Sequence, residues 1–206
     1  MLRVLGRKTS INVQKVMWLI EEMNVDVERV DIGGPFGGDK TPEYLAKNPN
    51  GLVPILEDGG FIVWESHAIV RYLSEKYGRA PWSPSGSAGR AVASQWMDWY
   101  LTKLHPPMTV IFMALLRTAP VDRDMDAVDT AVEQAGQMWA LLDKQLETGD
   151  YLTGNEPTIA DIPVGCSVSR WYAMDVDRPS LPNLEAWHDK LKERPAYQDH
   201  VIMPLS

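Results

Sequence analysis

The feature that most constrains the fold is a change of pattern at residues 78–87, GRAPWSPSGS. This stretch is rich in Gly, Pro and Ser and has no apolar periodicity, which is typical of a linker. Strand and helix patterns alternate before it, and almost every pattern after it has helical spacing. The sequence therefore predicts a small α/β domain at residues 1–77 and an all-helical domain at residues 88–206.

The first domain is expected to run strand–helix–strand and then helix–strand–strand–helix. Apolar runs, period-2 alternation and helical spacing place these elements at residues 2–5, 10–23, 25–32, 53–56, 61–64 and 65–77, with a short helix that starts at residue 41. Thr41 followed by Pro42 marks the start of the short helix, because a cap residue before a proline favours a helix N-terminus.

The second domain is expected to contain long helices joined by short loops. Helical spacing predicts them at residues 88–117, 122–147, 158–172 and 181–193. His105-Pro106-Pro107 interrupts the first of these and is expected to bend it, because proline cannot donate to the helical ladder.

Composition excludes several classes of partner. The formal net charge is −8 and Lys and Arg form no run, which argues against nucleic acid or an anionic membrane. The single cysteine, Cys166, cannot form an intramolecular disulfide, so a reducing compartment fits best. The first residues, MLRVLGRKTS, have no signal-peptide pattern, and His and Cys have no metal-binding spacing. We expect a cytoplasmic protein without a metal ion.

Pro54 stands at the start of an apolar strand, where proline is tolerated at an edge or a strand start. A helix–strand–strand–helix half that begins its first strand in this way resembles the thioredoxin-like pattern, in which the proline peptide is cis. A cis bond would turn the peptide groups of Val53 outward, where an extended cysteinyl peptide could pair with them. The alternative is a proline that starts an edge strand in trans.

Glu65 and Ser66 lie where a strand passes into a helix. Exposed amides at a helix start bind anions, the Ser66 hydroxyl can add a donor, and Glu65 can pair with an ammonium group. Together they could hold the head of an α-amino acid. The alternative is that the two residues only cap the helix.

In combination, these motifs resemble the glutathione S-transferase family over nearly the whole chain. NPNGLVPIL, WESHAIVRYL, the linker and YLTGNEPTIADI occur in the family's order, and Thr158 with Asp161 is similar to the family's buried capping box. The resemblance implies a thioredoxin-like domain followed by a helical bundle, glutathione as cosubstrate, a homodimer and a role in detoxification. Val53, Pro54, Glu65 and Ser66 would then hold the two ends of one tripeptide.

Family members keep a catalytic Tyr, Ser or Cys after the first strand, and this loop, GRKTSINVQKV, has no Tyr or Cys. Ser10 falls where serine-type members keep their hydroxyl, and Asn12 falls where some bacterial members place an asparagine. Thr9 is adjacent and stays open. A role for Ser10 as the helix cap is compatible with contact to the sulfur. Lys40 could meet the glycine carboxylate of the tripeptide, or it could be a solvated surface lysine.

The resemblance also implies an electrophile site on the bent helix, for which Met108, Phe112 and Arg117 are candidates. The favoured activity is transfer of glutathione to a small hydrophobic electrophile. Glutathione-dependent reduction of a disulfide or peroxide, and ligand binding without catalysis, remain alternatives. We expect His67 and His105 to be structural, Cys166 to be buried, and the helical tryptophans Trp96, Trp99, Trp139 and Trp171 to belong to the core.

Overall fold

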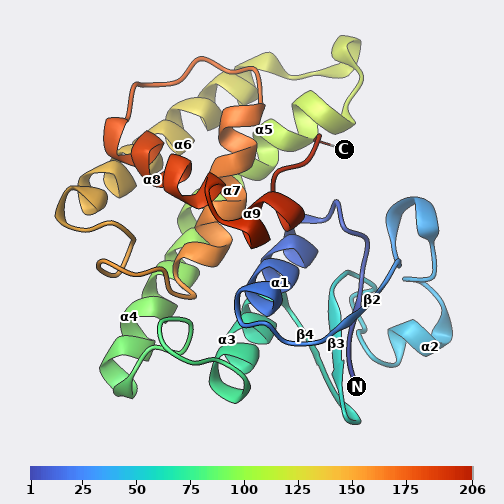
Figure 1. Ribbon diagram of the computed structural model, residues 1–206. Helices are drawn as coiled ribbons and strands as arrows, with labels where there is room; N and C mark the ends of the chain where they lie inside the picture. Colours follow the sequence, from blue (N-terminus) through green and yellow to red (C-terminus); the bar gives the residue numbers. More distant parts are fainter. Residues whose placement is uncertain (206) are drawn as a thin grey trace. The chain divides into compact units, whose positions relative to one another are not determined.

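The computed structural model describes residues 1–205 and divides the chain into two compact units. One unit contains Met1–Ser83 together with Pro195–Met203, and the other contains Pro84–Arg194 together with Pro204 and Leu205. In Figure 1 the first unit is therefore blue to green with a red helix. The expected helical domain ran from residue 88 to residue 206, and the structure differs because Pro195–Met203 packs with the first unit.

A four-stranded sheet forms the centre of the first unit. Its strands are β1 (Leu2–Leu5), β2 (Glu28–Val30), β3 (Ile55–Asp58) and β4 (Phe61–Trp64), in the order β2-β1-β3-β4. β1 is parallel to β2 and antiparallel to β3, which is antiparallel to β4.

Two strands differ from the sequence prediction. β3 was expected at 53–56, but Leu5 pairs with Ile55 and the ladder continues to Asp58. β2 was expected at 25–32 and pairs over Glu28–Val30; it starts later because Val25 N donates to the carbonyl of Ile20 at 3.2 Å and so belongs to the end of α1.

The sheet separates α1 (Ile11–Glu22) and α3 (Ser66–Lys76) from the short helix α2 (Pro42–Leu45), as Figure 1 shows. Val4 pairs with Leu56, and both are fully buried. Their neighbours Leu5 and Ile55 point to the opposite face, because successive strand residues alternate. There they pack with Tyr44 of α2.

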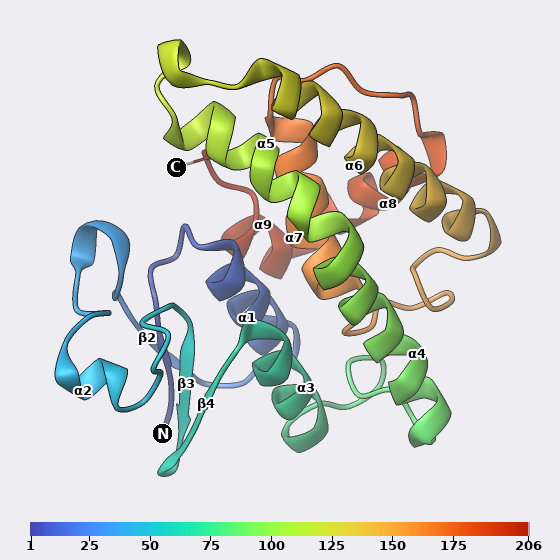
Figure 2. The same ribbon diagram turned by 180° about the vertical axis from the view of Figure 1, so that it is seen from behind.

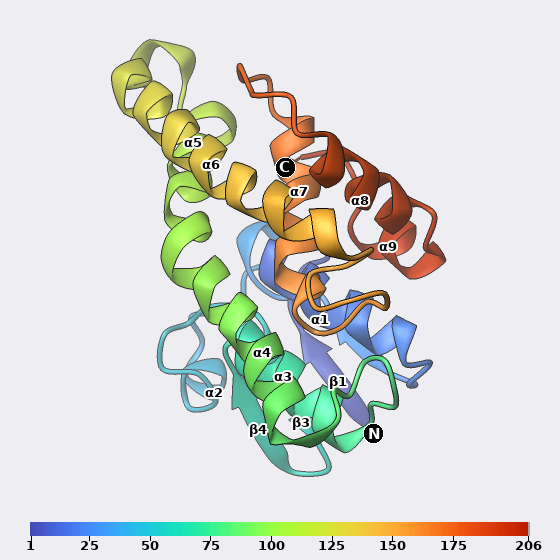
Figure 3. The ribbon, with the colours of Figure 1, turned by 90° about the vertical axis from the view of Figure 1, so that its left-hand side faces the viewer.

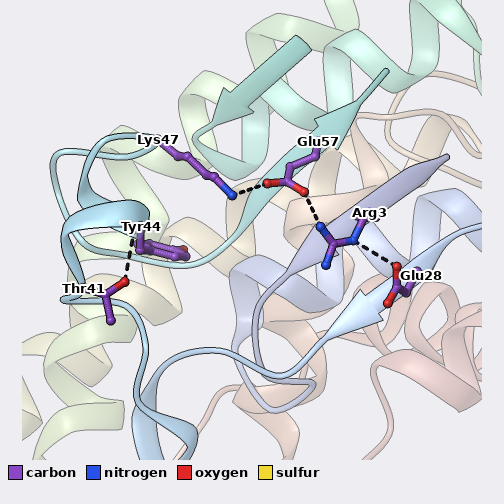
Figure 4. Close-up of polar contacts among 6 residues, drawn as sticks. All are labelled: Arg3, Glu28, Thr41, Tyr44, Lys47 and Glu57. Carbon is purple, nitrogen blue, oxygen red and sulfur yellow. Dashed lines mark hydrogen bonds and ion pairs between the residues drawn. The ribbon is translucent and has the colours of Figure 1, made fainter. Parts of the chain in front are cut away.

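The face of the sheet that packs against α2 also carries ion pairs next to these apolar residues (Figure 4). Arg3 of β1 donates to Glu28 at 2.9 Å and to Glu57 at 2.7 Å, and Lys47 donates to Glu57 at 2.6 Å. The hydrogen bond from Lys47, aided by Arg3, lowers the pKa of Glu57. α2 itself begins at Thr41, whose hydroxyl accepts from Tyr44 N, as its sequence predicted. These contacts hold the segment after α2 against the sheet.

The sequence analysis missed α9 (Pro195–His200), which completes the first unit. It packs against α1, where the Tyr197 ring meets Trp18 edge-on at 4.8 Å and His200 contacts Glu21. A helix of six residues offers too few turns for periodicity to reveal it.

The second unit is helical throughout its main elements (Figures 2 and 3). Its helices are α4 (Gly86–Trp99), α5 (His105–Arg117), α6 (Met125–Gln145), α7 (Asp161–Ala173) and α8 (Pro182–Lys192). A π-helical turn, Tyr100–Leu104, joins α4 to α5. Pro106 and Pro107 follow this turn directly and lie in the first turn of α5, where they remove two backbone N–H donors from an otherwise continuous helix.

The core of this unit includes the predicted Trp139, Trp171 and Cys166, all fully buried. Asp161 lies at the start of α7 and is also fully buried. Its carboxylate accepts from the backbone N–H of Thr158 at 2.9 Å and of Leu152 at 3.1 Å, and from Trp187 Nε1 at 3.2 Å. The predicted pairing of Thr158 with Asp161 is confirmed, since the Thr158 hydroxyl also accepts from Ala160 N.

Candidate functional site

Ser10 precedes the first turn of α1, with φ −76° and ψ 123°. Its carbonyl accepts from Val13 N and Gln14 N at 2.9 Å each, so the helix begins at this peptide. Its hydroxyl makes no capping hydrogen bond. The Ser10 side chain therefore does not cap α1. The hydroxyl stands beside the first amides of α1, which have no acceptor within a helix.

Asn12 and Ser66 are brought together from the first turns of two helices. Ser66 Oγ donates to Asn12 Oδ1 at 3.3 Å, and Lys15 Nζ donates to the same oxygen at 3.0 Å. Ser66 is only 5% exposed, whereas Asn12 is half-buried. The start of α1 and the start of α3 thus form one polar cluster.

The peptide bond between Val53 and Pro54 is cis, as the sequence predicted. The preceding carbonyl, that of Leu52, accepts from Tyr44 Oη at 2.7 Å and from Asn48 Nδ2 at 2.8 Å. Burial, with a contribution from Asp39, raises the pKa of Tyr44 to about 12, so the phenol stays a donor. The two side chains fix the segment, while the peptide groups of Val53 itself bond to no other residue within 1–205.

Glu65 has φ 71° and ψ 114°, a strained backbone conformation at the junction of strand and helix. Its carbonyl accepts from Ile69 N at 2.9 Å, and its side chain is exposed. An exposed acidic residue therefore stands directly before the first turn of α3.

Two further candidates lie in loops of the same unit. Lys40 is exposed, and its Nζ donates to the carbonyl of Gly51 at 2.6 Å. Thr9 is half-buried directly before Ser10.

Sequence reasoning missed Gly6, which positions the loop carrying Ser10. A Cβ atom at Gly6 would lie 2.5 Å from Val13 Cγ2 and 3.2 Å from Val53 Cβ, so no larger residue fits without displacing them. Arg29 Nη1 donates to the Gly6 carbonyl at 2.9 Å. A glycine directly after a strand was the available signal, since such residues permit close backbone approach.

The electrophile candidates lie in the helical unit. The ring of Phe112 is approached by the guanidinium of Arg117 at 5.4 Å and by that of Arg170 at 4.5 Å, a residue not predicted. Met108 is only 5% exposed and belongs to the core. His105, expected to be structural, lies with Nδ1 3.1 Å from Tyr100 Oη.

Two kinds of structural feature are absent from residues 1–205. No helix there has the length and apolar character needed to cross a membrane. The same part of the chain contains no group of three or more His, Cys, Asp or Glu side chains arranged to hold a metal ion.

The comparison with protein families matches both halves of the chain. Residues 2–75 match the glutathione S-transferase N-terminal domain, and residues 97–195 match the glutathione S-transferase C-terminal domain.

Individual proteins give the same result at full length. Glutathione S-transferase GstB of Escherichia coli strain K12 is 37% identical, with 100% of both chains covered. Glutathione S-transferase 4 of Zea mays is 31% identical over 94% of this chain and 89% of its own. The theta class glutathione S-transferase of Xanthomonas axonopodis pv. citri, solved with glutathione bound, superposes with a TM-score of 0.95 at 40% identity, covering 100% of this chain and 99% of its own.

The fold class predicted from the sequence, a thioredoxin-like domain followed by a helical bundle, is confirmed by these matches. Both family domains and a full-length relative above 30% identity support one conclusion: the chain belongs to the glutathione S-transferase family.

Proposed function

We propose that this glutathione S-transferase activates the glutathione thiol at the start of α1 and transfers the glutathionyl group to a small hydrophobic electrophile. The observation that carries the proposal is the Ser10 hydroxyl, which stands at the N-terminus of α1 without a capping hydrogen bond. It is a donor available to a sulfur anion. Asn12, which lies two residues after Ser10 in the first turn of α1, is the second donor.

The rest of the tripeptide would be held by the residues grouped around it. The unbonded peptide groups of Val53, before Pro54, suit an extended cysteinyl backbone. Ser66 and the amides of α3 suit the γ-glutamyl carboxylate, and the exposed Glu65 suits its ammonium group. Lys40 would meet the glycine carboxylate, with Thr9 beside the sulfur.

The free energies involved make the activation feasible. A thiol with a pKa near 8.5 is mostly protonated at neutral pH, and lowering this pKa by about two units requires roughly 2.7 kcal/mol. A helix N-terminus supplies about 0.3–1 kcal/mol, and a hydrogen bond to a charged acceptor about 1.5–3 kcal/mol. One helix end with the Ser10 hydroxyl therefore suffices, and the thiolate then attacks the electrophile without a general base.

We further propose that Phe112 and Arg117, together with Met108, contribute the electrophile site. The two guanidinium groups near the Phe112 ring favour a flat acceptor that carries negative charge or polar oxygens. A homodimer in the cytoplasm with a role in detoxification completes the proposal, supported by the family and by a single buried cysteine.

The main test is an ultraviolet titration of bound glutathione thiolate in wild type, Ser10→Ala and Asn12→Ala. Loss of the Ser10 hydroxyl should raise the titration midpoint by about one to two units. Binding should weaken far less, because the peptide contacts remain. Ser85→Ala is the matched control, since Ser85 holds the same position before α4 and also lacks a side-chain capping bond. If only Asn12→Ala moves the midpoint, Ser10 does not contact the sulfur.

A second experiment separates transfer from reduction. The wild type is assayed side by side with an aryl halide and with a mixed disulfide of glutathione. Asn12 beside Ser10, in a loop without cysteine, is compatible with reduction if a second glutathione supplies the second thiol. Activity with the disulfide alone would replace transfer by reduction, and absence of millimolar glutathione binding by calorimetry would favour a protein without this chemistry.

A further inference from the structure

Lys15 is a lysine in the interior of the first unit. It lies in the second turn of α1 and is only 1% exposed. Lysine is almost never fully buried without a specific partner, because removing an ammonium group from water is costly. The contacts of the Lys15 side chain therefore indicate its role.

The contacts of Lys15 join the starts of two helices. Its Nζ lies 3.0 Å from Asn12 Oδ1, on the same helical face, and 3.3 Å from Nε2 of His67, the second residue of α3. An ammonium group can only donate, so in this contact Nε2 of His67 is the acceptor. His67 is 5% exposed, so this bond holds the lysine at a fixed depth.

The same chemistry fixes the orientation of the Asn12 amide. Two donors face one end of this side chain: the Lys15 ammonium and, at 3.3 Å, the Ser66 hydroxyl. The end that faces an ammonium must be the oxygen, since the amide nitrogen only donates. The NH₂ group therefore points away from Lys15, and it donates to no other residue in the described part of the chain.

From this geometry we infer that Lys15 is a positioning residue of the sulfur site, which acts by holding the Asn12 amide with its NH₂ group directed at the glutathione thiolate. The inference rests on the proposed function. Without Lys15, the amide could rotate by half a turn and present its oxygen, which repels a thiolate.

Ser66 alone cannot maintain this orientation. Its hydroxyl has a single proton, which points to Asn12 Oδ1 in the structure. A carboxylate bound at the start of α3 competes for that proton, because a charged acceptor forms the stronger hydrogen bond. Once glutathione is bound, Lys15 is then the group that continues to hold the Asn12 oxygen.

The test is a double-mutant cycle on the thiol pKa of bound glutathione, with Lys15→Met, Asn12→Ala and the double variant. Lys15→Met keeps an unbranched apolar side chain in the buried position. It should raise the titration midpoint by about one unit, a tenfold loss of thiolate below the midpoint. In the Asn12→Ala background, Lys15→Met should change the midpoint by less than about 0.3 units, because the amide is gone.

Lys8→Met is the charge-matched control: Lys8 is exposed in the loop before α1, and its removal should leave the midpoint unchanged. If Lys15→Met folds poorly, Lys15→Gln removes the charge and keeps a polar end, and it should shift the midpoint in the same direction. Lys15→Arg keeps charge and donors and should restore most of the effect.

Three results overturn the inference. An equal shift from Lys15→Met in both backgrounds would mean that the charge acts on the sulfur directly and not through Asn12. A midpoint that no Lys15 variant changes would remove Lys15 from the site and leave the proposed function intact. A wild type that binds glutathione with its thiol pKa near 8.5 would refute both sulfur activation and the inference.

Discussion

Asp161 offers the sharpest prediction about stability, because it is a fully buried carboxyl group with three N–H donors around it. Burial raises its pKa from 3.8 to about 6, although the hydrogen bonds from Thr158, Leu152 and Trp187 oppose the shift. Desolvation and hydrogen bonding therefore compete at one side chain, and the pH dependence of stability shows which of them prevails.

The sign follows from proton linkage. Between pH 3.8 and about 6 the folded protein holds a proton on Asp161 that the unfolded chain has lost. The contribution of Asp161 to the unfolding free energy is thus fully present below pH 3.8 and falls as pH rises through 6. The total change is about 3 kcal/mol, of which about 2 kcal/mol lies between pH 4 and pH 7.

The perturbation is Asp161→Asn, which cannot titrate. It should cost about 1–3 kcal/mol at neutral pH, because one amide end presents a donor to another donor. This cost should be about 2 kcal/mol larger at pH 4 than at pH 7. The difference between the two proteins is the quantity to compare, since burial lowers the pKa of His188 to about 4 and gives the wild type an opposing dependence.

The assay is urea unfolding at several pH values, followed by the fluorescence of tryptophans buried in this unit, such as Trp139, Trp171 and Trp187. Asp143→Asn is the control. Asp143 also accepts from backbone amides, those of Asn183 and Leu184, but it is half-buried. Asp143→Asn should lower the unfolding free energy by about 1 kcal/mol, because these backbone amides lose a charged acceptor. A cost of Asp161→Asn that is larger at pH 7 would refute the reasoning and show that the three donors outweigh desolvation.

Three further predictions follow from features of the first unit and from the family. Burial would raise the pKa of Asp58, but hydrogen bonds from Lys76, Tyr77 and Tyr72 lower it to about 2. The contribution of Asp58 to the unfolding free energy, about 2 kcal/mol, should therefore disappear as pH falls from 3.8 through 2. Asp58→Asn should flatten the acid side of a plot of stability against pH, and an unchanged acid side would contradict this. Glu65→Gly should raise the unfolding free energy by about 1 kcal/mol, because it removes backbone strain, and a loss of stability would argue against strain. The same variant should bind glutathione roughly tenfold more weakly in calorimetry. Sedimentation at micromolar concentration should give the dimer mass, and a monomer would exclude the proposed homodimer.

Much of the fold was predictable because its signals are local. β4 at Phe61–Trp64 and the capped start of α2 at Thr41 agree with the sequence patterns. The register of β3 was not predictable, because it depends on pairing between Leu5 and Ile55, which are distant in sequence. The π-helical turn before Pro106 also escaped, since a proline pair indicates an interruption without specifying how the backbone absorbs it.

In the candidate site, too, some residues could be predicted from the sequence and others could not. Val53, Pro54, Glu65 and Ser66 could be found because a proline at a strand start and an acid at a helix start are visible in short motifs. Lys15 could not, because a lysine in an amphipathic helix is expected on the solvent face, and only the meeting of α1 with α3 gives it buried partners.

The packing of α9 on α1 has a consequence for how the protein is made. A ribosome releases the sheet, α1 and α3 long before it releases Tyr197, whose ring covers Trp18. The nascent first unit therefore carries an uncovered apolar face while the whole helical unit is synthesised, and such surfaces attract chaperones or other chains. Since Ser10 stands at the start of α1, a helix that is translated after the whole helical unit completes the packing of the helix that begins the proposed glutathione site.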